Sequence, residues 1–258
     1  MQKFLNENLL SRLVIDIGNS SIKIGIFDKQ SIIYTEKIPL AQENRIADVI
    51  KNYAIEVAMI CSVVKEKEKI IGKIISPYVK KIFYFDGQTK LPFENMYHTP
   101  ETLGKDRIAA MAGAQYLYPN ENLLVIDAGT AITYDLLVEN QFIGGNIAAG
   151  IDIRLKSLNY FTDKLPLVEF FDDSEIKIFG KKTSDAILSG AIMGILFEIG
   201  GYRNICQKEF GKILTIITGG SAKYFVKKIK SPIFANSNLV IIGLERILDI
   251  NNEDIKEK

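Results

Sequence analysis

Histidine and cysteine are scarce in this sequence. The 258 residues include one histidine, His98, and two cysteines, Cys61 and Cys206. A single histidine excludes a metal site with two histidine ligands, and it leaves a Ser-His-Asp hydrolase possible only if His98 is the base. The cysteines lie far apart and form neither a Cys-x-x-Cys pair nor a disulfide framework, so a reducing cytoplasm is expected. Aspartate is therefore the side chain that we expect to carry the chemistry.

An excess of charge and long apolar runs are also missing. The chain has 32 Lys and Arg against 31 Asp and Glu, a net charge of +1. This balance argues against nucleic acid as the main partner, because phosphate neutralisation needs clustered cations. Residues 1–11 lack the apolar segment of a secretion signal, and the longest uncharged stretch, residues 231–244, is shorter than the roughly 20 residues of a membrane span. We therefore expect no nucleic-acid or membrane partner and a cytoplasmic location.

The sequence does carry a clear α/β pattern. Hydrophobic residues make up 47% of the chain and charged residues 24%, and the length predicts one or two domains. Apolar runs predict strands at residues 13–16, 21–27, 31–37, 57–64, 81–85, 123–127, 131–138, 141–147 and 212–218. Helices are expected at residues 46–53, 65–75, 104–117, 150–158, 183–210, 221–228 and 239–250. Residues 86–102 predict a long loop, and the polar residues 118–122 a domain boundary.

One internal repeat relates the two halves of the chain. Residues 13–18 (Leu-Val-Ile-Asp-Ile-Gly) and 124–129 (Leu-Val-Ile-Asp-Ala-Gly) agree at five of six positions. Each is followed by small hydroxyl-bearing residues and then by a second predicted strand. The repeat predicts an internally duplicated fold in which Asp16 and Asp127 occupy equivalent strand ends and flank one cleft.

Turns of this composition are suited to phosphate binding. Glycine leaves the backbone N–H groups accessible, so their dipoles can point at an anion. An acid at the strand end repels phosphate unless a cation lies between them, so the pair suits a nucleoside triphosphate with a metal ion. Gly219 and Gly220 predict a third turn of the kind that lies against an adenosine. The glycine-rich motifs of P-loop and Rossmann proteins and the protein-kinase signatures are absent from the sequence.

Five ordered motifs resemble those of the type III pantothenate kinases, within the superfamily of acetate kinase, sugar kinases, Hsp70 and actin. They are Asp16-Ile17-Gly18-Asn19-Ser20, Gly104-Lys105-Asp106-Arg107, Ile126-Asp127-Ala128-Gly129-Thr130, Gly144-Gly145-Asn146-Ile147-Ala148-Ala149-Gly150 and Thr183-Ser184-Asp185-Ala186-Ile187. Within that superfamily, the Gly-x-Asp-Arg motif before an alanine-rich helix is specific to this family. One departure is Ala149, where the family pattern has proline, so the loop loses a restraint on φ.

The resemblance implies an α/β fold of two duplicated ribonuclease-H-like domains with a nucleotide cleft between them. It divides the chain into actin-like ATPase domains at residues 1–118 and 119–258. The implied reaction is ATP-dependent phosphorylation of pantothenate to 4′-phosphopantothenate, the first step of coenzyme A biosynthesis. The resemblance also implies potassium or ammonium as a monovalent cation and a homodimer, with the helix that begins at Thr183 near the interface. Mg²⁺ is expected with ATP, because it neutralises the phosphates.

The resemblance also assigns roles to single residues. Asp106 is the implied catalytic base, and Asp127 the residue that holds the monovalent cation. The implied pantothenate-binding residues are Tyr97, Gly104, Lys105, Asp106, Arg107 and Thr183. The implied ATP-binding residues are Asp16, Ile17, Gly18, Asn19, Ser20, Ser21, Ile22, Lys23 and Thr130. Ser20 stands where the family more often has threonine, so a hydroxyl is retained.

Several of these residues also fit a structural role. Asp106 and Thr183 fit the N-terminal caps of helices. Arg107 fits a surface arginine paired with Asp106 or Glu101. Tyr97 fits a loop aromatic packed on the surface.

Two other functions stay open. One is a non-catalytic nucleotide-binding accessory or regulatory protein, because the family name has been attached to accessory regulators of transcription. Intact Asp16, Asp106, Arg107 and Asp127 argue against that reading. The other is a related kinase that acts on a sugar or on acetate, and the Gly-Lys-Asp-Arg motif argues against it.

Overall fold

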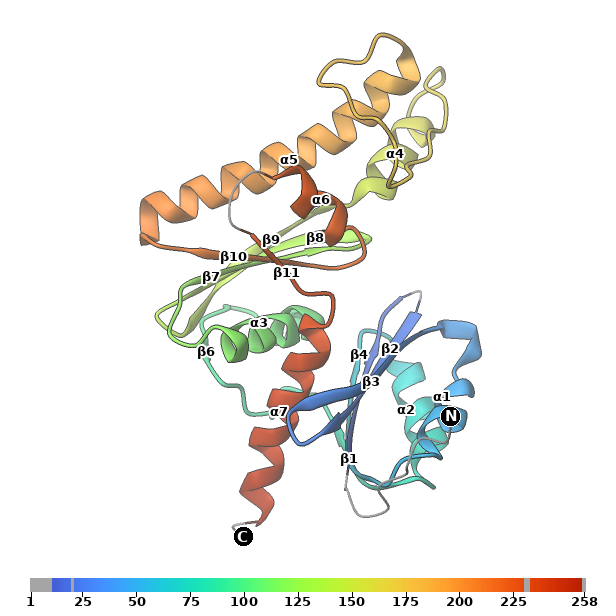
Figure 1. Ribbon diagram of the computed structural model, residues 1–258, viewed down its shortest axis with the longest axis vertical. Helices are drawn as coiled ribbons and strands as arrows, with labels where there is room; N and C mark the ends of the chain where they lie inside the picture. Colours follow the sequence, from blue (N-terminus) through green and yellow to red (C-terminus); the bar gives the residue numbers. More distant parts are fainter. Residues whose placement is uncertain (1–10, 20, 230–232, 257–258) are drawn as a thin grey trace. The chain divides into compact units, whose positions relative to one another are not determined.

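The computed structural model describes residues 11–19, 21–229 and 233–256, which form two compact units (Figure 1). Unit 1 holds the described residues up to Leu117 and those from Asn238 onward, and unit 2 runs from Tyr118 to Ser237. The predicted boundary near residue 118 lies where the chain passes from unit 1 to unit 2.

Unit 1 is built on a sheet with the strand order β3-β2-β1-β4-β5. Its strands are β1 (Ser11–Ile17), β2 (Ser21–Asp28), β3 (Ser31–Pro39), β4 (Ile55–Ser62) and β5 (Val79–Tyr84). The first three strands form an antiparallel meander, and β4 and β5 add to β1 in parallel. Consecutive buried residues in β1, Leu13, Val14 and Ile15, show that both faces of the sheet are covered.

Two pairs of helices cover the two faces of this sheet (Figure 1). The helices of unit 1 are α1 (Arg45–Ile50), α2 (Lys65–Ile75), α3 (Lys105–Leu117) and α7 (Leu239–Lys256). Isoleucines of α1 and α2 pack against Leu13 and Ile15. On the other face, α7 lies so close to the sheet that a Cβ at Gly25 would lie 2.3 Å from the Ile241 side chain. The loop before α3 contains only the short strand β6 (Glu94–Asn95) and a 3₁₀ turn, Pro100–Thr102.

Helix α7 belongs to unit 1, whereas the predicted second domain, residues 119–258, included it. The reason is a close helix crossing: a Cβ at Gly243 would lie 1.7 Å from the carbonyl oxygen of Ala109, and one at Gly113 would lie 2.2 Å from that of Leu239. The small residues expected on one face of α3 therefore pack against α7, the last helix of the chain.

Unit 2 repeats the sheet of unit 1. Within this unit the strand order is β11-β10-β7-β8-β9. The strands are β7 (Leu123–Ala128), β8 (Ala131–Val138), β9 (Gln141–Ala149), β10 (Leu214–Thr218) and β11 (Phe234–Ala235). As in unit 1, the first three strands are antiparallel and the last two add in parallel. The predicted duplication is therefore confirmed strand for strand, although the two-residue strand β11 was not predicted.

The helices of unit 2 are α4 (Ile151–Tyr160), α5 (Thr183–Phe210) and α6 (Ala222–Lys228). Helix α5 crosses one face of the sheet (Figure 1), where Ile192 and Ile195 share a buried cluster with Ile126 and Tyr134. Of the helices that the structure describes, α5 is the one long and apolar enough to cross a membrane, with 33% of its most apolar window buried. Part of the apolar character of α5 comes from isoleucines that are buried in the core of unit 2.

Candidate functional site

The β1–β2 turn carries the predicted ATP-phosphate segment. The Gly18 N–H donates to the Ser21 carbonyl at 3.0 Å and closes the turn. Ile17 and Ile22 on either side are fully buried, so they anchor the turn in the core. Asn19 is exposed at the tip. This arrangement leaves backbone groups and small polar side chains, rather than bulky ones, at the strand end.

Charged side chains lie on the strands next to this turn. Asp16 on β1 stands opposite Lys23 on β2 and opposite Cys61 on β4. Burial raises the pKa of the Cys61 thiol well above its usual value, and the negative charges of Asp16 and Asp106 add to that shift. The Lys105 ammonium opposes this shift, so charged groups of both signs from β1 and α3 lie near one buried thiol. Ser20, predicted with this segment, lies outside the described residues.

Residues 104–107 open helix α3. Asp106 lies in the first turn, and its Oδ1 accepts the backbone N–H of Arg107 at 2.9 Å. A Cβ at Gly104 would lie 2.5 Å from the same oxygen, so glycine leaves the carboxylate its space. The side chain of Asp106 is half-buried, and a helix N-terminus favours an anion at this place. Asp106 is the second residue of the helix and accepts the N–H of the next residue, whereas a cap accepts an N–H two or three residues further on, so the alternative role of Asp106 as the helix cap is not observed.

Arg107 and Tyr97 lie against each other. The guanidinium carbon is 5.7 Å from the centroid of the Tyr97 ring, a cation–π distance. Arg107 is only 6% exposed, so the alternative of a surface arginine is wrong. The Tyr97 N–H donates to Asn95 Oδ1 at 3.1 Å, which orders the loop. The structure thus joins two predicted substrate-binding residues, and a buried planar cation of this kind suits a carboxylate ligand.

Glu68 is a site neighbour that the sequence did not reveal. Its carboxylate, on α2, lies 4.0 Å from the Lys105 ammonium. The Glu68 Oε1 atom is buried and accepts no hydrogen bond within the part of the chain that the structure describes. No motif marks this residue, since a glutamate in the first turn of a helix is ordinary. His98, which was assigned no role, is exposed in the loop before α3.

The β7–β8 turn of unit 2 repeats the turn of unit 1. Here the Gly129 N–H donates to the Ala131 carbonyl at 3.1 Å, and Thr130 is exposed at the tip. The Gly150 N–H donates to the Thr130 carbonyl at 3.0 Å. A Cβ at Gly150 would lie 2.4 Å from that carbonyl oxygen, so only glycine fits there. The motif at residues 144–150 therefore ends against the predicted ATP-contacting turn.

Asp127 lies at the end of β7 against the third predicted turn. A Cβ at Gly219 would lie 2.4 Å from Asp127 Oδ1 and 2.7 Å from the carbonyl oxygen of Ala128. The φ of +90° at Gly219 is a conformation that favours glycine. The Ser221 N–H donates to the Ala128 carbonyl at 3.0 Å, which holds the turn in place. The Asp127 carboxylate and the Ala128 carbonyl therefore both lie against the Gly219 turn.

Thr183 is the first residue of α5 and is exposed. The cap position is held by Lys182, which makes no side-chain cap hydrogen bond. The alternative role of Thr183 as the helix cap is therefore not observed. Gly180 folds back against the start of the helix, because a Cβ there would lie 2.2 Å from the Ala186 backbone nitrogen.

Comparisons with known proteins agree with these motifs. The family profile described as type III pantothenate kinase matches residues 12–204. The type III pantothenate kinase of Phocaeicola vulgatus is 39% identical over 243 residues, which cover 93% of this chain and 99% of that protein. A Campylobacter jejuni structure described as a Baf family transcriptional activator has a TM-score of 0.64 at 22% identity and covers 93% and 99% of the two chains. The ROK hexokinase of Thermus thermophilus has a TM-score of 0.51 at 11% identity and covers 93% and 100%. The two structural likenesses bear on the fold alone.

Proposed function

The chain belongs to the type III pantothenate kinase family, and we propose that it transfers the γ-phosphoryl group of ATP to pantothenate as the first step of coenzyme A biosynthesis. The observation that carries this proposal is the start of α3, where a half-buried Asp106 is followed by a buried Arg107. A carboxylate base and a cation for the substrate's own carboxylate are the two groups that such a reaction asks of the protein.

Asp106 is the proposed catalytic base. The primary hydroxyl of pantothenate is a weak nucleophile, so its proton must pass to a nearby group as the oxygen attacks. In the proposed step that proton goes to Asp106, the new bond forms to the γ-phosphorus, and the bond to the bridging oxygen of ADP breaks. The hydrogen bond from the Arg107 N–H to Oδ1 holds the carboxylate in one orientation while the reaction proceeds.

Arg107 and Tyr97 are proposed to bind pantothenate. Pantothenate carries a carboxylate, and the guanidinium fork matches carboxylate geometry. The cation–π contact with the Tyr97 ring holds the guanidinium next to the loop before α3. Gly104, Lys105 and Thr183 complete the proposed set of substrate-binding residues.

The phosphates of ATP are proposed to bind the segment from Asp16 to Lys23, and Thr130 is proposed to contact ATP. The closed β1–β2 turn supports this proposal, since it presents backbone N–H groups without bulky side chains. Mg²⁺ bound to ATP would neutralise the phosphate charge. Potassium or ammonium is proposed at Asp127, because the Asp127 carboxylate and the Ala128 carbonyl at the Gly219 turn are oxygen donors that fit such an ion.

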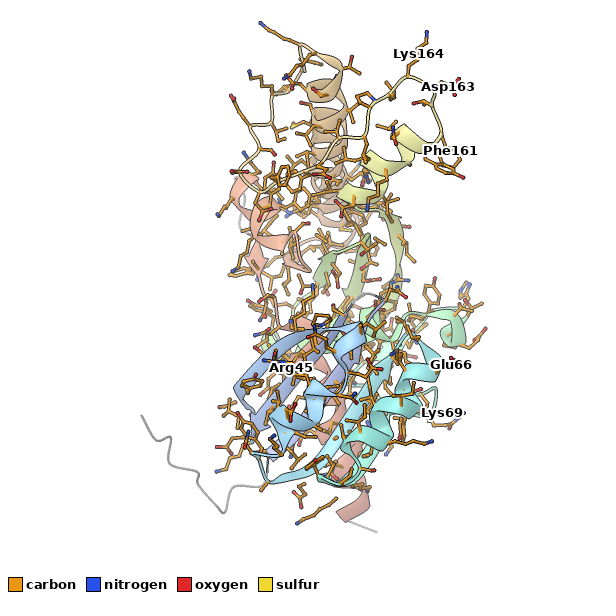
Figure 2. All side chains as sticks on the ribbon, turned by 90° about the vertical axis from the view of Figure 1, so that its right-hand side faces the viewer. Arg45, Glu66, Lys69, Phe161, Asp163 and Lys164 are labelled. Atoms are coloured by element: carbon orange, nitrogen blue, oxygen red, sulfur yellow. The ribbon has the colours of Figure 1, made fainter. Side chains whose placement is uncertain are left out.

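A homodimer is proposed, with α5 near its interface. Unit 2 exposes large apolar side chains on and around α4 and α5. Phe161, labelled in Figure 2 at the end of α4, is 79% exposed, Phe179 is 85% exposed, and Phe197 on α5 is 66% exposed. Several large apolar side chains exposed in one unit are costly in water, and a second copy of the chain is the proposed cover. A cytoplasmic location accompanies this proposal, since ATP and reduced cysteines both belong there.

The test is an assay of ADP release in potassium buffer, with and without pantothenate. We expect ADP formation only when pantothenate is present, with transfer of one phosphoryl group per ADP. A sugar or acetate in place of pantothenate serves as the control for related kinases. ATP binding without pantothenate-dependent turnover in a folded protein would favour the non-catalytic regulatory function instead.

A further inference from the structure

Arg154 on α4 is the centre of a hydrogen-bonded network inside unit 2. Its Nε donates to the carbonyl of Ala149 at 2.7 Å, and its Nη2 donates to Glu198 Oε2 on α5 at 2.6 Å. The hydroxyl of Tyr134 on β8 donates to the same Glu198 oxygen at 3.1 Å. The Arg154 guanidinium therefore connects the end of β9 to α5. The Tyr134 hydroxyl, on the sheet, bonds the same Glu198 carboxylate.

The fold makes room for this network. A Cβ at Gly194 would lie 3.3 Å from Arg154 Nη1, so glycine lets the guanidinium lie against α5. The Arg154 side chain is 20% exposed and therefore largely shielded from water. The ring of Tyr134 is buried and lies 4.3 Å from that of Tyr202, which fixes the hydroxyl beneath Glu198. Charge-assisted hydrogen bonds in such surroundings are stronger than surface ion pairs.

The network continues to the predicted ATP-contacting turn. Arg154 binds on both sides of Gly150: its side chain holds the Ala149 carbonyl, and its backbone N–H donates to the Gly150 carbonyl at 3.0 Å. Gly150 in turn donates its N–H to the Thr130 carbonyl at 3.0 Å. Two hydrogen bonds and the peptide group between Ala149 and Gly150 thus connect the guanidinium to the turn that carries Thr130.

We propose that Arg154 is a positioning residue that fixes the Thr130 turn for ATP, acting through Ala149 and Gly150. The inference rests on the proposed function, because it takes Thr130 as an ATP contact. The Arg154 side chain acts on the Ala149 carbonyl and so restrains the peptide group that joins Ala149 to Gly150.

The experiment compares Arg154→Ala with the matched control Lys156→Ala, which removes an exposed cation from the same helix. For each, the dissociation constant of ATP is measured by calorimetry without pantothenate, and KM is measured for both substrates. In Arg154→Ala we expect the dissociation constant and KM for ATP to rise about tenfold, because a charge-assisted hydrogen bond that orders the turn is lost. The KM for pantothenate should change less than about twofold, and Lys156→Ala should match the unmodified chain.

Two further variants separate positioning from general stability. Arg154→Lys keeps the charge but loses the planar guanidinium whose separate nitrogens reach the two acceptors, so about a threefold rise in the ATP constants is expected. Glu198→Gln keeps the contact of the guanidinium with Ala149 and an acceptor for its other nitrogen, so the ATP constants should rise less than in Arg154→Lys. These graded values, with similar melting temperatures, would support a positioning role.

Other outcomes would overturn the inference. Unchanged ATP binding in folded Arg154→Ala would do so, as would an equal rise in the KM of both substrates that follows a fall in melting temperature. The calorimetry needs no turnover, so it decides the role of Arg154 even if pantothenate-dependent ADP release, the test of the proposed function, fails.

Discussion

The two units share one sheet but differ in what covers it. The order β3-β2-β1-β4-β5 in unit 1 repeats as β9-β8-β7-β10-β11 in unit 2. In unit 1 both sheet faces are packed with helices, including the close crossing of α3 and α7. In unit 2, large apolar side chains around α4 and α5 stay exposed. The duplication has therefore kept the order of the strands, while the helices that cover them differ between the two units.

The two Asp-Gly turns show the same divergence at the level of single residues. Asp16 and Asp127 occupy equivalent strand ends, and the glycine two residues later closes each turn through one backbone hydrogen bond. Across the antiparallel pair, however, Asp16 faces Lys23, whereas Asp127 faces Thr133. Unit 1 thus places a built-in cation where unit 2 has a neutral hydroxyl. This difference is a physical reason for proposing an external cation in unit 2 and not in unit 1.

The largest expected effect concerns a group that unit 2 does not duplicate. Asp106→Asn removes the proposed base at the start of α3 but keeps an oxygen for the Arg107 N–H. We expect kcat to fall by up to about 10⁴-fold, since general-base catalysis supplies roughly 10²–10⁴-fold. The melting temperature should stay near that of the unmodified chain. Near-normal pantothenate-dependent ADP release by the folded variant would remove Asp106 as the base.

A stability test examines how α7 is held in unit 1. Arg12 on β1 donates to Glu245 at 2.7 Å and to Asp249 at 2.6 Å, both on α7 and both buried. Arg12→Met leaves two buried carboxylates without this cation, so the free energy of unfolding should fall by about 3 kcal/mol. Lys51→Met is the control, because it breaks an exposed ion pair with Asp48 that is worth about 0.5 kcal/mol or less.

The same variant has a defined pH dependence. Burial raises the pKa of Glu245 in the folded chain despite the opposing effect of Arg12. A raised folded-state pKa means that the protonated form favours folding, and that this contribution is lost as pH rises through the folded-state value. Without Arg12 the cost of ionisation grows, so the deficit of Arg12→Met should be largest near pH 7 and should shrink toward pH 4. A deficit that is constant from pH 4 to 7 in denaturant titrations would contradict this account.

A smaller effect is expected from the cation in unit 2. Asp127→Asn removes the proposed carboxylate ligand, so the stimulation of the reaction by potassium over sodium should disappear, with a loss of rate of about tenfold or more. The measurement is the rate of ADP release in potassium, ammonium and sodium chloride at equal ionic strength. Equal rates of the unmodified chain in all three salts would contradict the assignment of a monovalent cation to Asp127.

Many of the helices and strands, and the duplication of the two units, could be predicted from the sequence, because they depend on local patterns. The helices at residues 65–75 and 183–210 and the strand at residues 131–138 agree with the observed bounds. The repeat at residues 13–18 and 124–129 predicted the duplication. Hydrophobic periodicity and turn-forming residues involve only a few neighbouring positions, so they can be recognised in a single sequence.

The missed features depend on contacts between distant residues. Helix α7 joins unit 1 because Gly243 meets Ala109, more than 100 residues earlier in the chain. Arg154 and Glu198 are 44 residues apart and belong to no shared motif. Strand β11 has two residues, too few for a period. Pairings of this kind are set by the three-dimensional packing, so no local pattern reveals them.

The smallest expected effect on folding lies on the exposed surface of unit 2. Phe161 is 79% exposed, so Phe161→Ser removes little buried area, and the free energy of unfolding of the separate chain should change by less than about 0.5 kcal/mol. If a second copy covers this surface, the same change should weaken the dimer, which sedimentation over a range of concentrations would measure. Because dimerisation itself stabilises the fold, unfolding must be followed at concentrations where both proteins are monomeric. A dimer of unchanged affinity would show that the exposed aromatic residue lies outside the interface, and a monomer at every concentration would contradict the homodimer itself.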